Sequence, residues 1–257
     1  MLEVRSWRFT ALEFRTLWES TGRDVLPYPL RHRHTTEFAE DTMRLRQAAA
    51  RSLHSQLDDG LVRAVEVLLA PQARVELAGF TGRRRERKLR AHAGVHHEHG
   101  AIAVQEPGQD HDHGGDVTVR LLPAGDVARA VVDALPDRGP GRGRQLQVSA
   151  AELEQPRPHV RDAWKPTPRE EFEKFFTNAM TLVAHIGVYA TGSPDNRHLH
   201  GRKDFQINDV ENDGRYVTFG SDQLTVKPST ADRITATLRQ MIARTVDEVR
   251  DGVHLPF

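Results

Sequence analysis

The chain of 257 residues contains no cysteine, which excludes disulfide bonds and any zinc or redox site built on thiolates. Its first residues lack the basic segment followed by an apolar stretch that a secretory signal requires, and no apolar run is long enough to cross a bilayer. Lysine is scarce beside arginine, a bias typical of proteins from GC-rich bacterial genomes. We therefore expect a cytoplasmic protein with no membrane insertion.

The sequence has no excess of either charge, because 36 Lys and Arg residues balance 36 Asp and Glu residues. A net charge of zero gives no general attraction to nucleic acid or to an anionic membrane. Common enzyme signatures are missing too: there is no Gly-x-Ser-x-Gly nucleophile motif, no Gly-Lys-Ser/Thr phosphate-binding motif and no His-Glu-x-x-His zinc motif. We expect a binding protein that is not an enzyme and has no cofactor.

Two parts of the sequence repeat the same pattern. Residues 117–135 and residues 224–242 each contain a strand-like stretch, a proline and then an amphipathic helical pattern. Residues 7–13 and 146–152 form a second pair, in which a strand runs directly into a helix. The chain therefore resembles two related halves of a scaffold that presents surfaces for binding.

The expected organisation is a single domain, residues 1–257, built from two pseudo-repeat halves. The halves comprise residues 1–136 and 145–257, and a connector rich in proline and glycine joins them at residues 137–144. The predicted fold is α+β, with a central, mostly antiparallel sheet flanked by two helical bundles and a quasi-two-fold internal duplication.

Capping boxes are predicted to begin a helix in each half, through Thr10 with Glu13 and Ser149 with Glu152. The other predicted helices are a long one that begins at Thr35 or Thr36, 61–69, 168–180, and a last one that begins at Ser229. The main predicted strands are 74–81, 89–97, 101–105 and 116–121 in the first half, and 182–191, 202–208, 215–219 and 223–226 in the second. A turn is expected at His99-Gly100.

Six short motifs lie in order along the chain: LPYPL at 26–30, LLAP at 68–71, VVDALPDRGPGRG at 131–143, AHIGV at 184–188, DVENDGRY at 209–216 and VKPS at 226–229. Their order and spacing resemble the EspG family, the cytosolic chaperones of mycobacterial type VII (ESX) secretion systems. The resemblance covers nearly the whole chain.

The resemblance implies a chaperone or adaptor that binds a secreted helical protein pair and covers its apolar tip until export. PE–PPE-like pairs are the first expectation for this partner, and a WXG-type pair is the alternative. We expect a monomer or a weak dimer. In this family the contacts are attributed to the sheet face, the C-terminal helical bundle and the loop between the second and third strands, which corresponds here to residues 81–88.

The residues expected to contact the partner are Arg83, Arg84, Arg85, Arg87, Phe205, Asp209, Arg215 and Tyr216. The arginine run has three interpretations: a solvated loop, an electrostatic guide for an acidic patch on a protein, or a site for nucleic-acid phosphates. Phe80 is the only aromatic residue close enough to stack on a base, which disfavours nucleic acid. Arg215 is expected to pair with Asp209 or Asp213.

Histidines are frequent between residues 92 and 113, and imidazoles are good ligands for zinc, nickel and copper. The histidines of this segment are His92, His96, His97, His99, His111 and His113. The carboxylates Asp110, Asp112 and Asp116 lack the distal glutamate of an EF-hand calcium loop. We expect solvated histidines and no metal site; a metal-dependent enzyme is the alternative interpretation.

Overall fold

A computed structural model of the protein describes residues 3–33, 39–155, 166–192 and 202–252. The cap predicted at Thr35 or Thr36 lies outside these residues. The strands are β1 (Arg5–Phe9), β2 (Ala73–Thr81), β3 (Arg87–His96), β4 (His99–Pro107), β5 (Gly114–Pro123), β6 (Leu146–Ser149), β7 (Met180–Ala190), β8 (Lys203–Val210), β9 (Arg215–Phe219) and β10 (Gln223–Pro228). The helices are α1 (Ala11–Glu19), α2 (Ala39–Gln56), α3 (Asp59–Leu69), the 3₁₀ turn η1 (Ala124–Asp126), α4 (Val127–Val132), α5 (Ala150–Glu154), α6 (Pro168–Phe176) and α7 (Ala231–Arg250).

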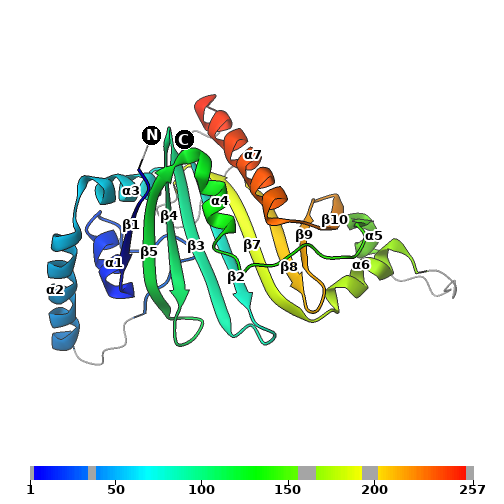
Figure 1. Cartoon of the computed structure of the whole chain (residues 1–257), viewed down its shortest axis with the longest axis horizontal. Coiled ribbons are helices and arrows are strands. Elements are labelled where there is room, and N and C mark those ends of the chain that lie inside the picture. The colour runs from blue at the N-terminus through cyan, green and yellow to red at the C-terminus, as the bar shows by residue number, and fades with distance from the viewer. Residues whose placement is uncertain (1–2, 34–38, 156–165, 193–201, 253–257) are drawn as a thin grey trace.

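All ten strands form one sheet in the order β1-β5-β4-β3-β2-β7-β8-β9-β10-β6, and every neighbouring pair is antiparallel (Figure 1). Outward from the centre, the order is β2-β3-β4-β5-β1 on one side and β7-β8-β9-β10-β6 on the other. Each half therefore places its strands in the same order, which confirms the predicted quasi-two-fold α+β fold.

The two halves meet at the β2–β7 pair, whose register runs from Ala73 opposite Ala190 to Thr81 opposite Leu182. Gly79 lies at this seam opposite Ala184, and a β-carbon at position 79 would come within 2.6 Å of the Val183 carbonyl oxygen. The sheet is continuous across the seam. The two halves therefore share one sheet.

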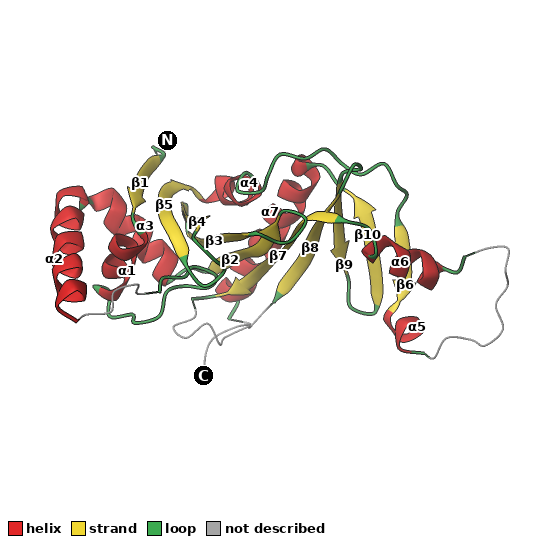
Figure 2. Cartoon of the chain, turned by 90° about the horizontal axis from the view of Figure 1, so that it is seen from below, coloured by secondary structure: helices red, strands yellow, loops and turns green. Residues whose placement is uncertain are grey.

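Helices cover both faces of the sheet, because its strands are apolar on both sides at the centre. On one face, α4 and α7 pack over the central strands, and Ile234, Leu238 and Ile242 of α7 are buried there. On the other face, α1 and α3 cover the outer strands of the first half through a core that includes Phe14 and Leu61. Figure 2 shows α1–α3 at one end of the molecule and α5 and α6 at the other.

Several predicted boundaries and caps are wrong. Ser149 makes no side-chain cap to α5; the second half instead has a complete capping box between Thr167 and Glu170 at the start of α6. The cap of the last helix is Thr230, whose hydroxyl oxygen accepts a hydrogen bond from the Arg233 amide, and not Ser229.

Two further boundaries differ from the prediction. The helix expected over 168–180 ends at Phe176, where the Asn178 side chain donates to the Phe175 carbonyl oxygen, and Met180 already begins β7. The β3–β4 turn is at His97, in the left-handed region at φ 52°, rather than at His99-Gly100. Gly100 lies in β4, where a β-carbon would come 2.3 Å from Val127, so this glycine allows close packing of α4.

Candidate functional site

The arginine run forms the loop between β2 and β3, at one end of these central strands, and Arg87 is the first residue of β3 (Figure 1). Gly82 and Arg85 both have positive φ angles, 88° and 59°, and the Arg85 amide donates to the Gly82 carbonyl oxygen at 3.0 Å. The Glu86 carboxylate accepts a hydrogen bond from the Arg84 amide at 3.2 Å. This turn projects the side chains of the run into solvent, where they are exposed.

Two neighbouring loops hold the β2–β3 loop in place. Arg83 forms an ion pair with Glu211 of the β8–β9 turn, with Nε and Oε1 2.5 Å apart. On the other side, His111 of the β4–β5 loop donates from Nε2 to the Arg85 carbonyl oxygen at 2.7 Å. The three loops thus meet at one end of the sheet, and the second half of the chain supplies Glu211.

The side chains of the other exposed arginines at this loop have no carboxylate partner among the described residues. Among the described residues, none forms a hydrogen bond or an ion pair with the side chain of Arg84, Arg85 or Arg87. The hydrogen bond to Glu211 raises the pKa of Arg83, so the guanidinium stays charged and the Glu211 carboxylate compensates that charge. The loop presents three unpaired positive charges on a turn whose backbone is fixed.

Arg215 and Asp209 form a bidentate ion pair inside the protein, which settles the alternative partners considered for Arg215. The Nε–Oδ1 and Nη2–Oδ2 distances are 2.7 and 2.8 Å, and the two side chains are 2% and 3% exposed. Arg215 Nη2 also donates to the Pro136 carbonyl oxygen at 2.7 Å. The guanidinium thus joins β8, β9 and the start of the connector.

The connector runs along β9 and is hydrogen-bonded to it. The Arg215 amide donates to the Gly139 carbonyl oxygen at 2.8 Å, and the Gly141 amide donates to the Arg215 carbonyl oxygen at 3.0 Å. Tyr216 accepts a hydrogen bond from the Gly143 amide and donates to Asp213. The DGRY sequence therefore anchors the connector.

The contacts of Tyr216 and Asp213 determine the ionisation states of their side chains. Burial and the hydrogen bond to Asp213 raise the pKa of Tyr216. Partial burial acts to raise the pKa of Asp213, but hydrogen bonds from Tyr216 and Arg142 outweigh it and the pKa is lowered. The pair is therefore held as phenol and carboxylate, the forms that its hydrogen bond requires.

The eight residues expected to contact a partner fall into two groups of four. The four arginines of the β2–β3 loop are exposed. Phe205, Asp209, Arg215 and Tyr216 are between 2% and 4% exposed, so their side chains are parts of the scaffold and a partner cannot reach them in this structure. The sequence analysis considered His111 only as a possible metal ligand and did not single out Glu211, although Glu211 lies within the DVENDGRY motif that carries the family resemblance.

The histidines of residues 92–113 do not gather at one point. His92 is buried, where its Nδ1 donates to the Tyr28 carbonyl oxygen at 2.8 Å, and burial lowers its pKa to about 4. His96 bonds the Ala70 carbonyl oxygen and His113 pairs with Asp110. The described residues include no group of three or more His, Cys, Asp or Glu side chains placed to hold a metal ion.

In the described parts of the chain, no helix combines the length and apolar character that crossing a membrane demands.

Comparisons with known proteins agree on a fold and a family. No curated protein matches the sequence. A solved structure of the Mycobacterium tuberculosis type VII secretion system chaperone EspG5, in complex with a PE25-PPE41 dimer, contains a chain with a similar fold. The TM-score is 0.56 at 12% identity, and the match covers 94% of this chain and 96% of that chain.

The EspG family model matches residues 10–240, a span that begins beside β1 and ends within α7. This span includes both halves of the sheet, the connector and the three loops that meet around Arg83. The sequence resemblance and the observed fold are thus explained together: the chain belongs to the EspG family.

Proposed function

We propose that this protein is a cytoplasmic, non-enzymatic chaperone of a type VII secretion system that binds a secreted helical protein pair of the PE–PPE type. The family match over residues 10–240 carries this proposal. The EspG5 structure, with its PE25-PPE41 dimer, provides the precedent for a helical pair as the partner of a chain with this fold. Shielding the apolar tip of such a pair keeps it soluble until export.

The β2–β3 loop supplies a means of attracting the partner. Arg84, Arg85 and Arg87 are exposed and unpaired among the described residues, and two neighbouring loops fix the backbone beneath them. A fixed group of like charges steers a partner with an acidic patch and accelerates encounter at low ionic strength. The loop thus favours the interpretation of the arginine run as an electrostatic guide for a protein.

Nucleic acid is a poorer fit to the same loop. Phe80, the aromatic residue that base stacking would need, is covered by Lys88, whose Nζ lies 3.7 Å from the ring centroid. The His111 and Phe80 rings form an edge-type contact with their centroids 5.0 Å apart. Lys88 and His111 thus compete with a base for the Phe80 ring.

Co-expression with the PE–PPE-type pairs encoded in the same genome tests the proposal. A stable complex with at least one helical pair, retained through size-exclusion chromatography, is the expected result. Parallel co-expression with WXG-type pairs distinguishes the two classes of partner. Failure to retain any helical pair, with the chaperone itself folded and soluble, would contradict the proposed function.

A further inference from the structure

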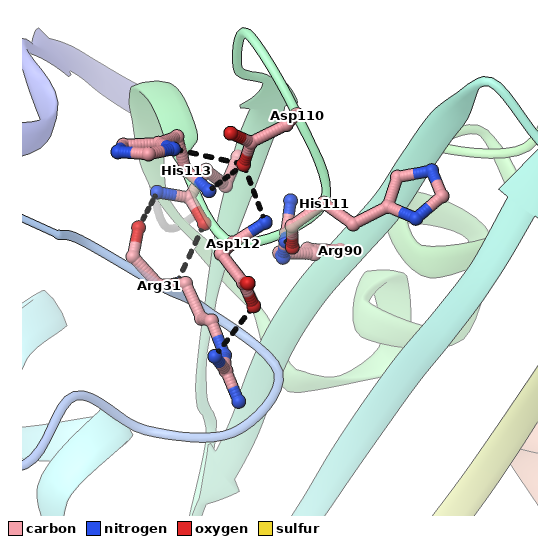
Figure 3. Close-up of polar contacts among 7 residues, drawn as sticks. Arg31, Arg90, Asp110, His111, Asp112 and His113 are labelled. Carbon is pink, nitrogen blue, oxygen red and sulfur yellow. Dashed lines mark hydrogen bonds and ion pairs between the residues drawn. The ribbon is translucent and has the colours of Figure 1, made fainter.

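The β4–β5 loop covers a group of positive charges that the proposed function does not use (Figure 3). Asp110 Oδ1 accepts hydrogen bonds from the Asp112 and His113 amides and pairs with the His113 ring at 2.8 Å. Asp112 Oδ1 pairs with Arg31 Nη1 at 3.0 Å. Both carboxylates of the loop are thus engaged with other donors, and neither bonds Arg90.

Arg90 lies beneath this loop on β3 and is 1% exposed. Its Nη2 donates to the His111 carbonyl oxygen at 2.5 Å. Its Nε and Nη1 are buried and have no hydrogen-bond acceptor among the described residues. A buried charged donor without an acceptor is unfavourable, so this guanidinium is placed for an acceptor that no described residue supplies.

Two more cations lie beside Arg90. Lys88 is two residues earlier on β3 and therefore on the same face of the strand, and no described residue accepts a hydrogen bond from its Nζ. Burial and the charges of Arg90 and Arg31 lower the pKa of Lys88. Burial and the Arg31 charge likewise lower the pKa of Arg90, against the weaker effects of Asp112 and Asp110. Positive charge is thus in local excess.

We propose that Lys88 and Arg90, with Arg31 at the rim, form a binding site for a small oxygen-bearing anion beneath the β4–β5 loop. The oxygens of a phosphate or a carboxylate supply the acceptors that Arg90 Nε and Nη1 lack, and the negative charge offsets the excess. Since these two nitrogens are out of contact with solvent, the loop lifts from Arg90 when the anion enters. Its one hydrogen bond to the guanidinium, through the His111 carbonyl, is replaced by the ligand.

Titration of the full chain with inorganic phosphate at constant ionic strength, followed by calorimetry, tests this site. Saturable binding of one phosphate is expected, with amide chemical shifts that change at His111 and Asp112. A parallel titration with acetate distinguishes a phosphate-type ligand from a carboxylate-type ligand. The absence of saturable binding of either anion would overturn the proposal.

Variants locate the site. Arg90→Met removes both unpaired donors, so it should weaken phosphate binding by at least about tenfold to hundredfold, the loss expected for a single charge-assisted hydrogen bond, while the protein stays folded without phosphate. Arg87→Gln is the matched control: it removes an exposed arginine from the opposite face of β3 and should leave the affinity unchanged. Equal binding by Arg90→Met, or an equal loss in Arg87→Gln, would show that the anion binds elsewhere.

Lys88→Gln keeps the test decisive if Arg90→Met fails to fold. Lys88 is half-buried and its side chain makes only a ring contact with Phe80 among the described residues, so the fold tolerates its loss. The affinity for phosphate should fall by about tenfold. Unchanged affinity in a folded Lys88→Gln variant would contradict the proposed site.

Discussion

Arg83 and Arg84 are neighbours in one loop but have different electrostatic surroundings. The charge of Arg83 is compensated by Glu211, and this ion pair fixes the position of the loop. Arg84 forms no ion pair with a described residue, so its charge can attract a partner protein. A substitution of Arg83 therefore alters the structure of the loop, whereas a substitution of Arg84 alters the electrostatic field that a partner protein meets.

Arg84→Glu should slow association with the helical partner without unfolding the chaperone. A reversed charge at an exposed rim position acts on the association rate, so we expect a decrease of about threefold to tenfold at low ionic strength that fades as salt is added. Surface plasmon resonance at two salt concentrations measures this. Arg51→Glu, on the exposed surface of α2, is the control and should associate like the wild type. Equal rates for all three proteins would contradict the guiding role of the loop.

His92 makes the stability of the fold depend on pH. Its pKa is lowered from 6.5 to about 4, chiefly by burial, so the unfolded chain binds a proton more readily than the folded chain does. The contribution of neutral His92 is complete above about pH 6.5 and is lost as the pH falls toward 4, by about 3 kcal/mol in total.

Urea unfolding at pH 7 and at pH 4.5 tests this prediction. The free energy of unfolding of His92→Gln should fall less between the two pH values than that of the wild type, because only the wild type has this buried titrating group. His54→Gln, at an exposed position on α2, should behave like the wild type. The same loss in all three proteins would show that carboxylates alone cause the acid sensitivity.

At the scale of elements, two helices of the second half begin in different ways. Thr167 and Glu170 satisfy each other's backbone donors at the start of α6, whereas Ser149 leaves α5 without a side-chain cap. The sequence contains the pattern for a box at both places, since Ser149 is followed by Glu152 three residues later. Only the structure shows which of the two forms.

Thr167→Ala should destabilise α6 by about 1 kcal/mol, because the Glu170 amide loses its acceptor. Amide hydrogen exchange in Glu171–Phe175 reports this locally and should accelerate by about fivefold. Ser149→Ala is the matched control and should leave exchange in α5 unchanged. An effect of Ser149→Ala as large as that of Thr167→Ala would contradict this assignment of the caps.

Local composition was enough to predict β2, β3, β4 and β5 and their counterparts in the second half, because strand-forming residues lie together in the sequence between turn-forming residues. The ends of the strands were less predictable, because packing against other elements decides where a strand begins and ends. Gly100 is typical of a turn by composition, yet it lies inside β4 because α4 needs the space above it. The exposed arginines were predictable for the same local reason, and the burial of Arg215 was not, since its partners come from β8 and the connector.

At the scale of the molecule, contacts between residues far apart in sequence decide the arrangement. The β2–β7 pair that joins the halves, and the ion pair of Arg83 with Glu211 across 128 positions, have no local sequence signal. A repeat in the sequence predicts two similar halves but not which edges they share. Only the structure shows that the shared strands are β2 and β7.

Gly79→Ala should disturb both halves together, because its β-carbon would come within 2.6 Å of Val183 and Ala184 across the seam. We expect a loss of about 1–3 kcal/mol in the free energy of unfolding. Hydrogen exchange should accelerate in both β4 and β9. Gly125→Ala, where a β-carbon meets no atom within 4 Å, is the control. Acceleration confined to one half would show that the halves unfold separately and would contradict the single-domain prediction.

The anchored connector also bears on how copies of this chain interact. A molecule built from two similar half-sheets is prone to domain swapping, in which each half pairs with the complementary half of another copy, and a mobile hinge between the halves makes such exchange easy. Here the connector is held against β9 by hydrogen bonds of three glycines. The Gly139 carbonyl oxygen and the Gly141 amide bond the backbone of Arg215, and the Gly143 amide donates to the Tyr216 hydroxyl. This anchoring favours intramolecular closure over exchange of halves between copies.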